Sequence, residues 1–503
     1  MELHAIALSA LERIHADEIE RHYGELAYHA EHARITDKAL DYLRKAGKTS
    51  ADSYQNNQAL DYFTRALSFV PPDDLATRYD LAAECVELYS RMGKRDLQLN
   101  DLNSLEQWAG HLNDTTRLAN AMMLRTRYHH TIGEYLNAIK YAQRVEKYLG
   151  DSMPEITIKT RISYSSSLLR VGKADESMEQ AKMGLEAAIK SGRRADEARV
   201  LTVMGLTALE QKDHGLAHQY LEESLRIARE LKERRLESYA LNNLAVSVGA
   251  FKGNYALAGE YYEQAYAIAR EVGDRYQESV SLTNLGFTAG VQGNLPEAFR
   301  FYEQALLFAR EIANLNLETY TLINLSAIAG NQMNSLLAMD YARQASDLSH
   351  NIHDRSAEAW SQLYIGRAHL LLQEYSNARE AFIRSINIRD ELGQTSLSME
   401  PLGGLVETAL LMDDLQEASR TVEKILAYFK EGGAMDGTDE PLRVYHACYR
   451  FLHRQKDPRA QQVLQSANQM LEAQVSKFKD EGLRKKFVEN FPWRKALHDA
   501  ARN

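Results

Sequence analysis

A small residue recurs along this 503-residue chain at intervals close to forty, and this repeat limits the possible fold more than any other feature. The positions are Ala59, Gln98, Ala138, Ser177, Ala217, Ala258, Ala298, Ala338, Ala378, Ala418 and Ala460. Self-similarity at a period of about 20–50 residues is typical of solenoids, in which each repeat buries its apolar face against its neighbours. We therefore predict a repeat array rather than one large core.

Composition and local signals favour two helices in each repeat. The chain has only 8 prolines, and the valine-rich alternating runs that form strands are nearly absent. In one well-formed copy, Leu285 is expected to fill the core and Gly286 to let a neighbouring backbone approach closely. Gly293 then ends the first helix, Asn294 caps the second helix, and Pro296 fits its first turn. Each copy thus predicts a helix, a tight turn and a helix.

The second helix of this copy carries the small–aromatic–small stripe Ala298, Tyr302 and Ala305. With the Leu-Gly of the first helix, this order resembles the tetratricopeptide repeat over residues 25–467, most strongly over 195–426. Copies of about forty residues resemble those of kinesin light chain and of the polarity adaptor LGN or Pins. HEAT and armadillo arrays share the period but lack the glycine turn and the stripe. The resemblance implies an all-α, right-handed α-solenoid (superhelix) of about ten helix pairs with terminal capping helices.

Both ends of the chain differ from the central copies, since Ala39 and Ala59 are only 20 residues apart. The predicted parts are an N-terminal helical junction with the first repeat-like helices (1–70), the array (71–430), a flexible glycine-rich linker (431–441) and C-terminal repeat-like and capping helices (442–503). The junction and the ending LRKKFVENFPWRKALHDA resemble the helical regions of bacterial signalling ATPases, including those with a class III nucleotide cyclase and relatives of the maltose regulator. This resemblance implies the sensor or scaffold part of such a protein.

Charge and hydropathy exclude several partners. A net charge of −10 and an isoelectric point near 5.9 argue against nucleic acid, because binding phosphates requires a basic face. No apolar run approaches the ~20 residues of a membrane-spanning helix, and the N-terminus lacks the features of a signal peptide. Cys85 and Cys448 fit neither a disulfide framework nor a metal site, so we expect reduced core residues. We therefore expect a cytoplasmic protein without membrane contact.

No motif predicts catalysis. Gly47, Lys48 and Thr49 resemble the end of a phosphate loop, but Tyr42 stands where that loop needs glycine, so Lys48 is expected to face solvent on a helix. Four histidines recur near a seven-residue spacing without a His-Glu-x-x-His arrangement: His15, His22, His29 and His32. Neither a Gly-x-Ser-x-Gly elbow nor a dinucleotide fingerprint is present. We predict no catalytic residue, no metal and no cofactor, and hence no enzyme.

Asparagines recur at the repeat period on the first helices. Asn243, Asn284 and Asn324 each precede a core leucine, at intervals of 41 and 40. The resemblance to kinesin light chain and LGN-like arrays implies that they line a concave face and hydrogen-bond the backbone of an extended peptide. An amide offers both donor and acceptor groups for that purpose. The alternative is that these asparagines bridge neighbouring helices.

Aromatic and cationic residues accompany this ladder. The other predicted groove residues are Tyr239, Tyr320, Trp360, Tyr364, Arg367, Arg275 and Arg355. Aromatic anchors beside amides are typical of binding grooves, although such aromatics also pack between repeats and such arginines are commonly solvated. A second ladder is expected to interact with helix dipoles rather than with a ligand: Glu197, Glu237, Glu278, Glu318 and Glu358.

These patterns together predict a non-enzymatic scaffold or sensor module in bacterial signalling that binds a protein or peptide segment on a groove centred on residues 239–367. One alternative is a regulatory domain that responds to a small ligand and controls an attached or associated ATPase, cyclase or other effector. A third possibility is structural self-association. The ligand, the effector and the oligomeric state leave no mark in the sequence.

Overall fold

The computed structural model of the chain describes residues 1–53, 55–149, 153–252, 254–312, 314–435, 437–478 and 480–502, without the side chains of residues 250–252. Helices make up 84% of the chain, and the described residues contain no strand. The predicted all-α solenoid of consecutive helix pairs is therefore confirmed. Asp436, inside the predicted linker, lies outside the described residues.

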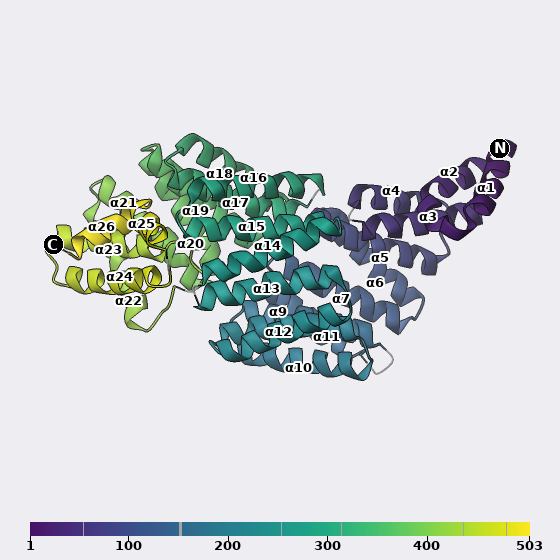
Figure 1. Cartoon of the computed structure of the whole chain (residues 1–503), viewed down its shortest axis with the longest axis horizontal. Coiled ribbons are helices and arrows are strands. Elements are labelled where there is room, and N and C mark those ends of the chain that lie inside the picture. The colour runs from purple at the N-terminus through teal and green to yellow at the C-terminus, as the bar shows by residue number, and fades with distance from the viewer. Residues whose placement is uncertain are drawn as a thin grey trace. The chain divides into compact units, whose positions relative to one another are not determined.

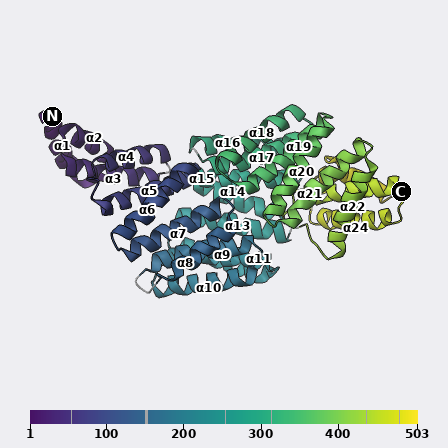
Figure 2. The ribbon, with the colours of Figure 1, turned by 180° about the vertical axis from the view of Figure 1, so that it is seen from behind.

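The helix pairs run from α3–α4 to α23–α24, as Figures 1 and 2 show. The first helices are α3 (Thr36–Asp52), α5 (Leu75–Met92), α7 (Thr115–Thr131), α9 (Pro154–Arg170), α11 (Arg194–Glu210), α13 (Arg234–Lys252), α15 (Arg275–Val291), α17 (Leu315–Asn331), α19 (Arg355–Leu371), α21 (Thr395–Leu411) and α23 (Pro441–Arg454). The second helices are α4 (Asn56–Ser68), α6 (Arg95–His111), α8 (Tyr135–Glu146), α10 (Ala174–Lys190), α12 (His214–Glu230), α14 (Tyr255–Glu271), α16 (Leu295–Glu311), α18 (Ser335–Asn351), α20 (Tyr375–Glu391), α22 (Leu415–Lys430) and α24 (Arg459–Val475). The remaining helices are α1 (Glu2–Ile14), η1 (Ala16–His22), α2 (Tyr23–Ala33), α25 (Glu481–Glu489) and α26 (Pro492–Ala500).

The chain forms two compact units. Unit 1 comprises residues 1–240, 267–278 and 308–316. Unit 2 comprises residues 241–266, 279–307 and 317–503. The boundaries predicted at residues 70, 430 and 441 stay predictions.

The recurring small residues occupy one place in the pairs. From α4 to α22 each is the fourth residue of its second helix, and all are buried. Ser177 keeps this place because its hydroxyl lies 2.8 Å from that of Ser165 and 3.0 Å from that of Thr207, so the buried polar group is satisfied. Gln98 accepts a hydrogen bond from the buried Arg95. The forty-residue period therefore reflects a packing site that alanine fills best.

The glycine of the Leu-Gly pair makes room for an aromatic ring. A Cβ at Gly286 would lie 2.9 Å from Cε1 of Tyr302, and one at Gly366 would lie 2.6 Å from Cε1 of Phe382. The sequence interpretation, in which a neighbouring backbone fills this space, was wrong on this point, because the ring of the paired second helix fills it. Gly293, with φ of 78°, ends α15 in the left-handed conformation as predicted.

The Gly-Lys-Thr string lies inside helix α3. Gly47 packs beneath the ring of Phe63, and Lys48 faces solvent as predicted. A phosphate loop binds phosphate through free backbone N–H groups. In this segment the N–H groups are already bonded within the helix, so it cannot cradle phosphates. Both cysteines are buried and free, as expected, and burial raises the pKa of each thiol to about 12.

Candidate functional site

The predicted asparagine ladder is partly tied into the fold of unit 2. Asn284 on α15 donates its side-chain N–H to the Oδ1 atom of Asn242 on α13 at 3.3 Å. Asn242, which is buried, in turn donates to the hydroxyl of Ser281 at 2.9 Å. Asn243 and Asn324 are half-buried on α13 and α17. Asn284 thus joins neighbouring first helices, and all three predicted asparagines are half-buried as residues.

Asn242 is a residue that sequence reasoning missed. The available signal was the Asn242–Asn243 doublet, followed 39 residues after Asn242 by Ser281 at a comparable place on α15. Residues separated by about forty positions lie at equivalent places in adjacent repeats and can contact one another. This spacing therefore identifies the Asn242–Ser281 hydrogen bond once the helix register is known.

The predicted aromatic residues of α17 and α19 lie in unit 2, each with identified partners. Trp360 and Tyr364 stack with their ring centroids 6.4 Å apart and an interplanar angle of 20°. The guanidinium of Arg389 lies 4.6 Å from the Trp360 ring, within cation–π range. Tyr320 donates its hydroxyl to Asp354 at 3.1 Å and is 38% exposed. Tyr320 is therefore open to solvent, whereas Trp360 is held by contacts on its ring.

Arg355 and Arg275 belong to a repeated ion-pair arrangement. An arginine that begins a first helix contacts a glutamate three residues later and the last residue of the second helix of the same pair. The sets are Arg194 with Glu197 and Glu230, Arg234 with Glu237 and Glu271, Arg275 with Glu278 and Glu311, and Arg355 with Glu358 and Glu391. These contacts give the predicted glutamate ladder a partner besides the helix dipole. With arginines about 40% exposed, each pair is expected to contribute about 0–1 kcal/mol.

Tyr364 contacts a non-helical, acidic stretch of the chain itself, and Arg367 beside it pairs with a glutamate of α21. The hydroxyl of Tyr364 donates to the carboxylate of Asp439, and the backbone N–H of Glu440 donates to the carboxylate of Glu400 on α21. The guanidinium of Arg367 lies 3.4 Å from Glu400 and 5.0 Å from the centre of the Tyr364 ring. The face of α19 and α21 therefore already holds a short polypeptide segment with an acidic side chain.

The acids of this contact influence one another. Surrounding helices desolvate the carboxyl of Asp439 even though water reaches part of that residue, and the negative charge of Glu400 lies nearby. Both effects raise the pKa of Asp439 above its ordinary value. Burial also raises the pKa of the Tyr364 hydroxyl, which stays protonated and able to donate. At this contact the Tyr364 hydroxyl therefore donates a hydrogen bond to the carboxyl group of Asp439, and Arg367 next to it pairs with Glu400.

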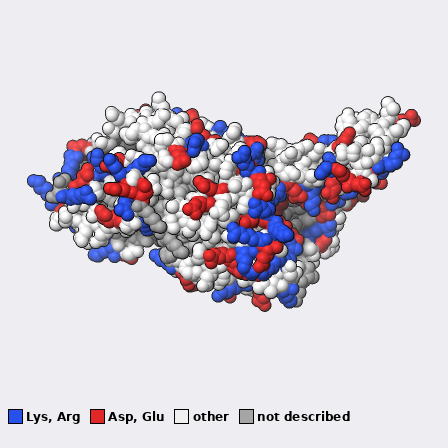
Figure 3. All heavy atoms as spheres, viewed as in Figure 1, with Lys and Arg blue, Asp and Glu red and all other residues white. Residues whose placement is uncertain are grey.

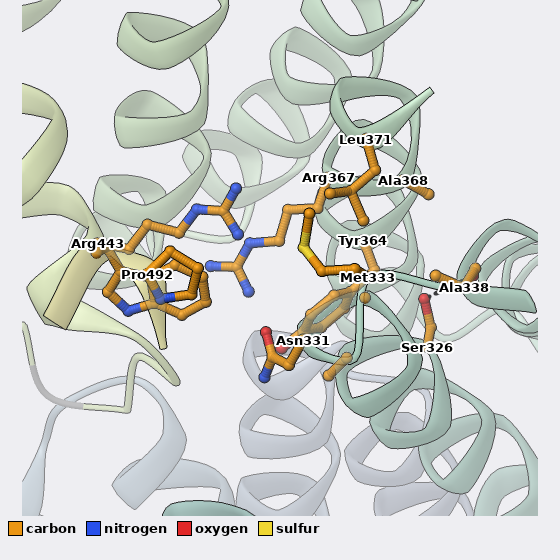
Figure 4. Close-up of a pocket in the computed structure, with 13 residues that line it drawn as sticks. Ser326, Asn331, Met333, Ala338, Tyr364, Arg367, Ala368, Leu371, Arg443 and Pro492 are labelled. Carbon is orange, nitrogen blue, oxygen red and sulfur yellow. Dashed lines mark hydrogen bonds between the residues drawn. The ribbon is translucent and has the colours of Figure 1, made fainter. Parts of the chain in front are cut away.

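A cavity of about 50 Å³ lies next to this contact in unit 2. Figure 4 shows the side chains of Arg367 and Arg443 reaching toward one another, with Pro492 beside Arg443. Met333 and Leu371 contribute to its apolar wall. Trp493 of α26 also lines the cavity, so the C-terminal helices cover one side of it.

A larger hollow lies in unit 1. It has a volume of about 640 Å³, and the ends of α5, α7, α9 and α11 supply its lining. Tyr79 donates its hydroxyl to the backbone carbonyl of Arg117 at 2.6 Å, and Asn120 donates to the Tyr79 hydroxyl at 3.2 Å. Arg117 also pairs with Asp114 at 2.7 Å. The hollow thus combines a held tyrosine with polar groups of both charges.

Tyr239 and Arg275 belong to unit 1, and the other predicted groove residues belong to unit 2. Tyr239 is 43% exposed. The single groove that the sequence predicts across all ten residues stays a prediction. The part of it that unit 2 contains brings together Tyr364 and Arg367 through their ring and guanidinium contact.

The histidines form ring contacts rather than a ligand set. His15 stacks on His22 with centroids 3.7 Å apart, and His4 lies beside His29 and His32. Across the residues that the structure describes, no group of three His, Cys, Asp or Glu side chains is placed to hold a metal ion. Among those same residues, no helix combines the length and apolar character needed to span a bilayer.

Three solved structures resemble the chain at low identity. A Rap protein complexed with competence and sporulation factor is 15% identical, with 71% of this chain and 98% of that chain covered and a TM-score of 0.45. A signal transduction ATPase with numerous domains from Pyrococcus horikoshii, which has a tetratricopeptide repeat sensor, is 16% identical, with coverages of 73% and 55% and a TM-score of 0.46. BtubC (BKLC) from P. vanneervenii is 19% identical, with coverages of 45% and 91% and a TM-score of 0.38. At these values the likenesses carry no argument about a ligand or partner.

The family comparison is more specific. No curated protein sequence matches the chain. The family model described as tetratricopeptide repeat matches residues 236–311, which span α13 to α16. These are two of the copies in which the turn and small–aromatic–small signals are best formed. The chain therefore carries tetratricopeptide repeats, with the matched copies at residues 236–311.

Proposed function

We propose that this chain is a non-enzymatic scaffold or sensor module that binds an extended protein segment along the first-helix face of unit 2. The observation that supports this most is the contact of Tyr364 with Asp439, in which the face already receives a non-helical part of the polypeptide. Tetratricopeptide repeats serve in general as protein-interaction scaffolds. A signalling role in bacteria and a cytoplasmic location belong to the same proposal.

The chemistry of the face favours a segment that is extended and acidic. An extended segment leaves backbone N–H and C=O groups unpaired, and the half-buried amides of Asn243, Asn284 and Asn324 can satisfy them. Tyr320 offers an exposed aromatic surface beside them. Tyr364 and Arg367 indicate which chemistry this face accepts, because within the chain the buried Tyr364 donates to the carboxylate of Asp439 and Arg367 pairs with Glu400.

The amides are tested by replacing Asn243, Asn284 and Asn324 together by alanine. The partner segment is first mapped to a synthetic peptide by pull-down with the wild-type chain, and its affinity is then measured by fluorescence anisotropy. Each backbone hydrogen bond lost contributes about 0.5–1.5 kcal/mol, so three losses are expected to weaken binding by about tenfold or more. The melting temperature should fall only slightly, mainly through loss of the Asn284–Asn242 bond.

A matched control removes three amides from exposed positions of second helices. Asn137, Asn351 and Asn377 are exposed, and their replacement by alanine should leave both the affinity and the melting temperature unchanged. A large drop in melting temperature with unchanged peptide affinity in the first variant would instead assign the predicted ladder to bridges between helices.

A second candidate function is favoured by the hollow of unit 1. Its volume of about 640 Å³ falls in the range of about 300–1,000 Å³ that small-molecule sites occupy. In this reading a metabolite binds beside Tyr79, Arg117 and Asn120 and regulates an attached or associated ATPase, cyclase or other effector.

The second candidate is tested with a panel of anionic and neutral metabolites. A ligand of unit 1 is expected to raise the melting temperature of the wild-type chain by several degrees, because binding to the folded state stabilises it. Asn120→Ala, which removes a polar lining group, should abolish the shift, whereas Asn377→Ala should retain it. A panel without any shift, or shifts that survive Asn120→Ala, would contradict this site.

A further inference from the structure

The last two helices of unit 2 fold back onto much earlier repeats. Asn490, which follows α25, donates its side-chain N–H to the backbone carbonyl of Gly293 at 2.9 Å, across 197 positions of sequence. Phe478, just before α25, stacks on Tyr255 of α14 with ring centroids 5.9 Å apart. The end of the chain is therefore anchored on the α15–α16 turn and on α14, and not only on its neighbours in sequence.

The same helices hold the acidic stretch that contacts Tyr364. Glu440 accepts hydrogen bonds from the indole N–H of Trp493 at 3.0 Å and from the guanidinium of Arg494 at 2.7 Å. Glu440 directly follows Asp439, whose carboxylate accepts the Tyr364 hydroxyl. Trp493 also lines the cavity beside Arg367. One latch, the Glu440 carboxylate with Trp493 and Arg494, thus connects α26 to the face proposed for binding.

Several features make this closed arrangement less favourable than an ordinary core. Arg494 and Glu440 are both buried, and the desolvation of a buried ion pair is commonly not repaid by its attraction. Among the described residues, neither Nε of Arg494 nor Oε2 of Glu400 has a hydrogen-bond partner. The cavity under Trp493 also leaves van der Waals contacts unmade. A contact with such defects is suited to exchange for another partner.

The two helices themselves are amphipathic and short. Their inner side buries Phe487, Phe491 and Leu497, while Lys485 and Lys495 remain exposed. Figure 3 shows Lys and Arg side chains gathered over the helices near the C-terminus. Each helix has nine residues, too few to be stable in water without packing, so detachment from the repeats would unfold it.

We infer that α25 and α26, residues 481–500, form an intramolecular lid that covers the Tyr364–Arg367 face and is displaced when a partner segment binds. The inference rests on the proposed function for the identity of the site, and it adds that the free chain is autoinhibited. The cover of the cavity beside Tyr364 and Arg367 is thus formed by Pro492 and Trp493 of the chain's own C-terminus, and Glu440 with Trp493 and Arg494 holds it closed.

The lid is tested in the full-length chain with the variant Arg494→Ala, which removes one side of the latch. Hydrogen–deuterium exchange of the amides of residues 481–500 should accelerate at least tenfold, while the amides of α20 keep their protection. Lys495→Ala, an exposed change on the same helix, should exchange like the wild type. Trp493→Phe keeps a smaller aromatic ring in the core and removes the hydrogen bond to Glu440, so it replaces Arg494→Ala if that variant does not fold.

A synthetic peptide of residues 480–502, with its native Arg494, then serves as a probe. It should bind the Arg494→Ala chain at least tenfold more tightly than the wild type, whose own lid occupies the site. Equal binding to both chains, or loss of protection that spreads through α23 and α24, would overturn the lid and make α25–α26 a permanent cap.

The mapped partner peptide separates the two proposals. If the proposed function and the lid both hold, it binds the Arg494→Ala chain at least tenfold more tightly than the wild type. Equal affinity for the two chains overturns the lid and leaves the proposed function standing. If the 480–502 peptide binds the Arg494→Ala chain but the partner peptide does not, the proposed function is overturned. The face would then bind only the C-terminus of the chain itself.

Discussion

Replacing Phe382 by alanine is expected to lower the stability of the unit 2 repeats around α20 by about 3–5 kcal/mol. The ring is 0% exposed, and it fills space that Gly366 on α19 and Gly404 on α21 leave open. A Cβ at either glycine would lie within 2.6 Å of the ring, so the backbones on both sides are set by its presence. Removal leaves a void that three consecutive helices cannot close without moving. Hydrogen–deuterium exchange in α19–α21 and the urea midpoint measure the effect.

Two further variants check that the loss comes from this packing site. Phe287→Ala removes a 48% exposed ring of α15 and is expected to cost less than about 1 kcal/mol. Gly366→Ala adds a methyl group against the Phe382 ring and should cost about 1–3 kcal/mol through overpacking. A Phe382→Ala chain with wild-type exchange rates in α19–α21 would contradict the assignment of the ring as the centre of this layer.

Mild acid is expected to destabilise the chain through two half-buried histidines. Burial lowers the pKa of His130 and of His446 to about 4, against 6.5 for an ordinary histidine; nearby arginines add to this effect at both, while Glu407 opposes it at His446. Between about pH 6.5 and pH 4 the unfolded chain binds protons that the folded chain excludes, so stability falls as the pH falls through this window. Partial solvent access to the two imidazoles reduces the effect. Protonation of both histidines is expected to lower the free energy of unfolding by about 2–4 kcal/mol. Urea midpoints at about pH 7 and about pH 4.5 measure it.

The double variant His130→Gln and His446→Gln isolates this contribution from the protonation of carboxylates. Its stability should depend less steeply on pH between about 6.5 and 4, while His111→Gln, at an exposed position, should follow the wild type. If the double variant and the wild type lose stability in parallel, neither histidine excludes protons in the folded chain.

The sequence by itself determined the class of fold, the register and most of the turns. Ala217, Ala298 and Ala378 could be placed without coordinates because a helix pair must present a small residue wherever two helices approach closely. Gly293 could be placed at a helix end because only glycine adopts a left-handed backbone without steric cost. These rules act locally and recur at a fixed period, and such a period can be read directly from the amino-acid sequence.

The tertiary structure decided which partner each of these residues meets. That the ring of Tyr302 fills the space at Gly286, and that Asn242 rather than a ligand accepts from Asn284, depends on distances between helices that no spacing encodes. The contact of Asn490 with Gly293 joins positions 197 residues apart. Sequence periodicity predicts contacts between adjacent repeats, whereas a chain end that folds back is placed by the total surface it buries, which exists only once the repeats have assembled.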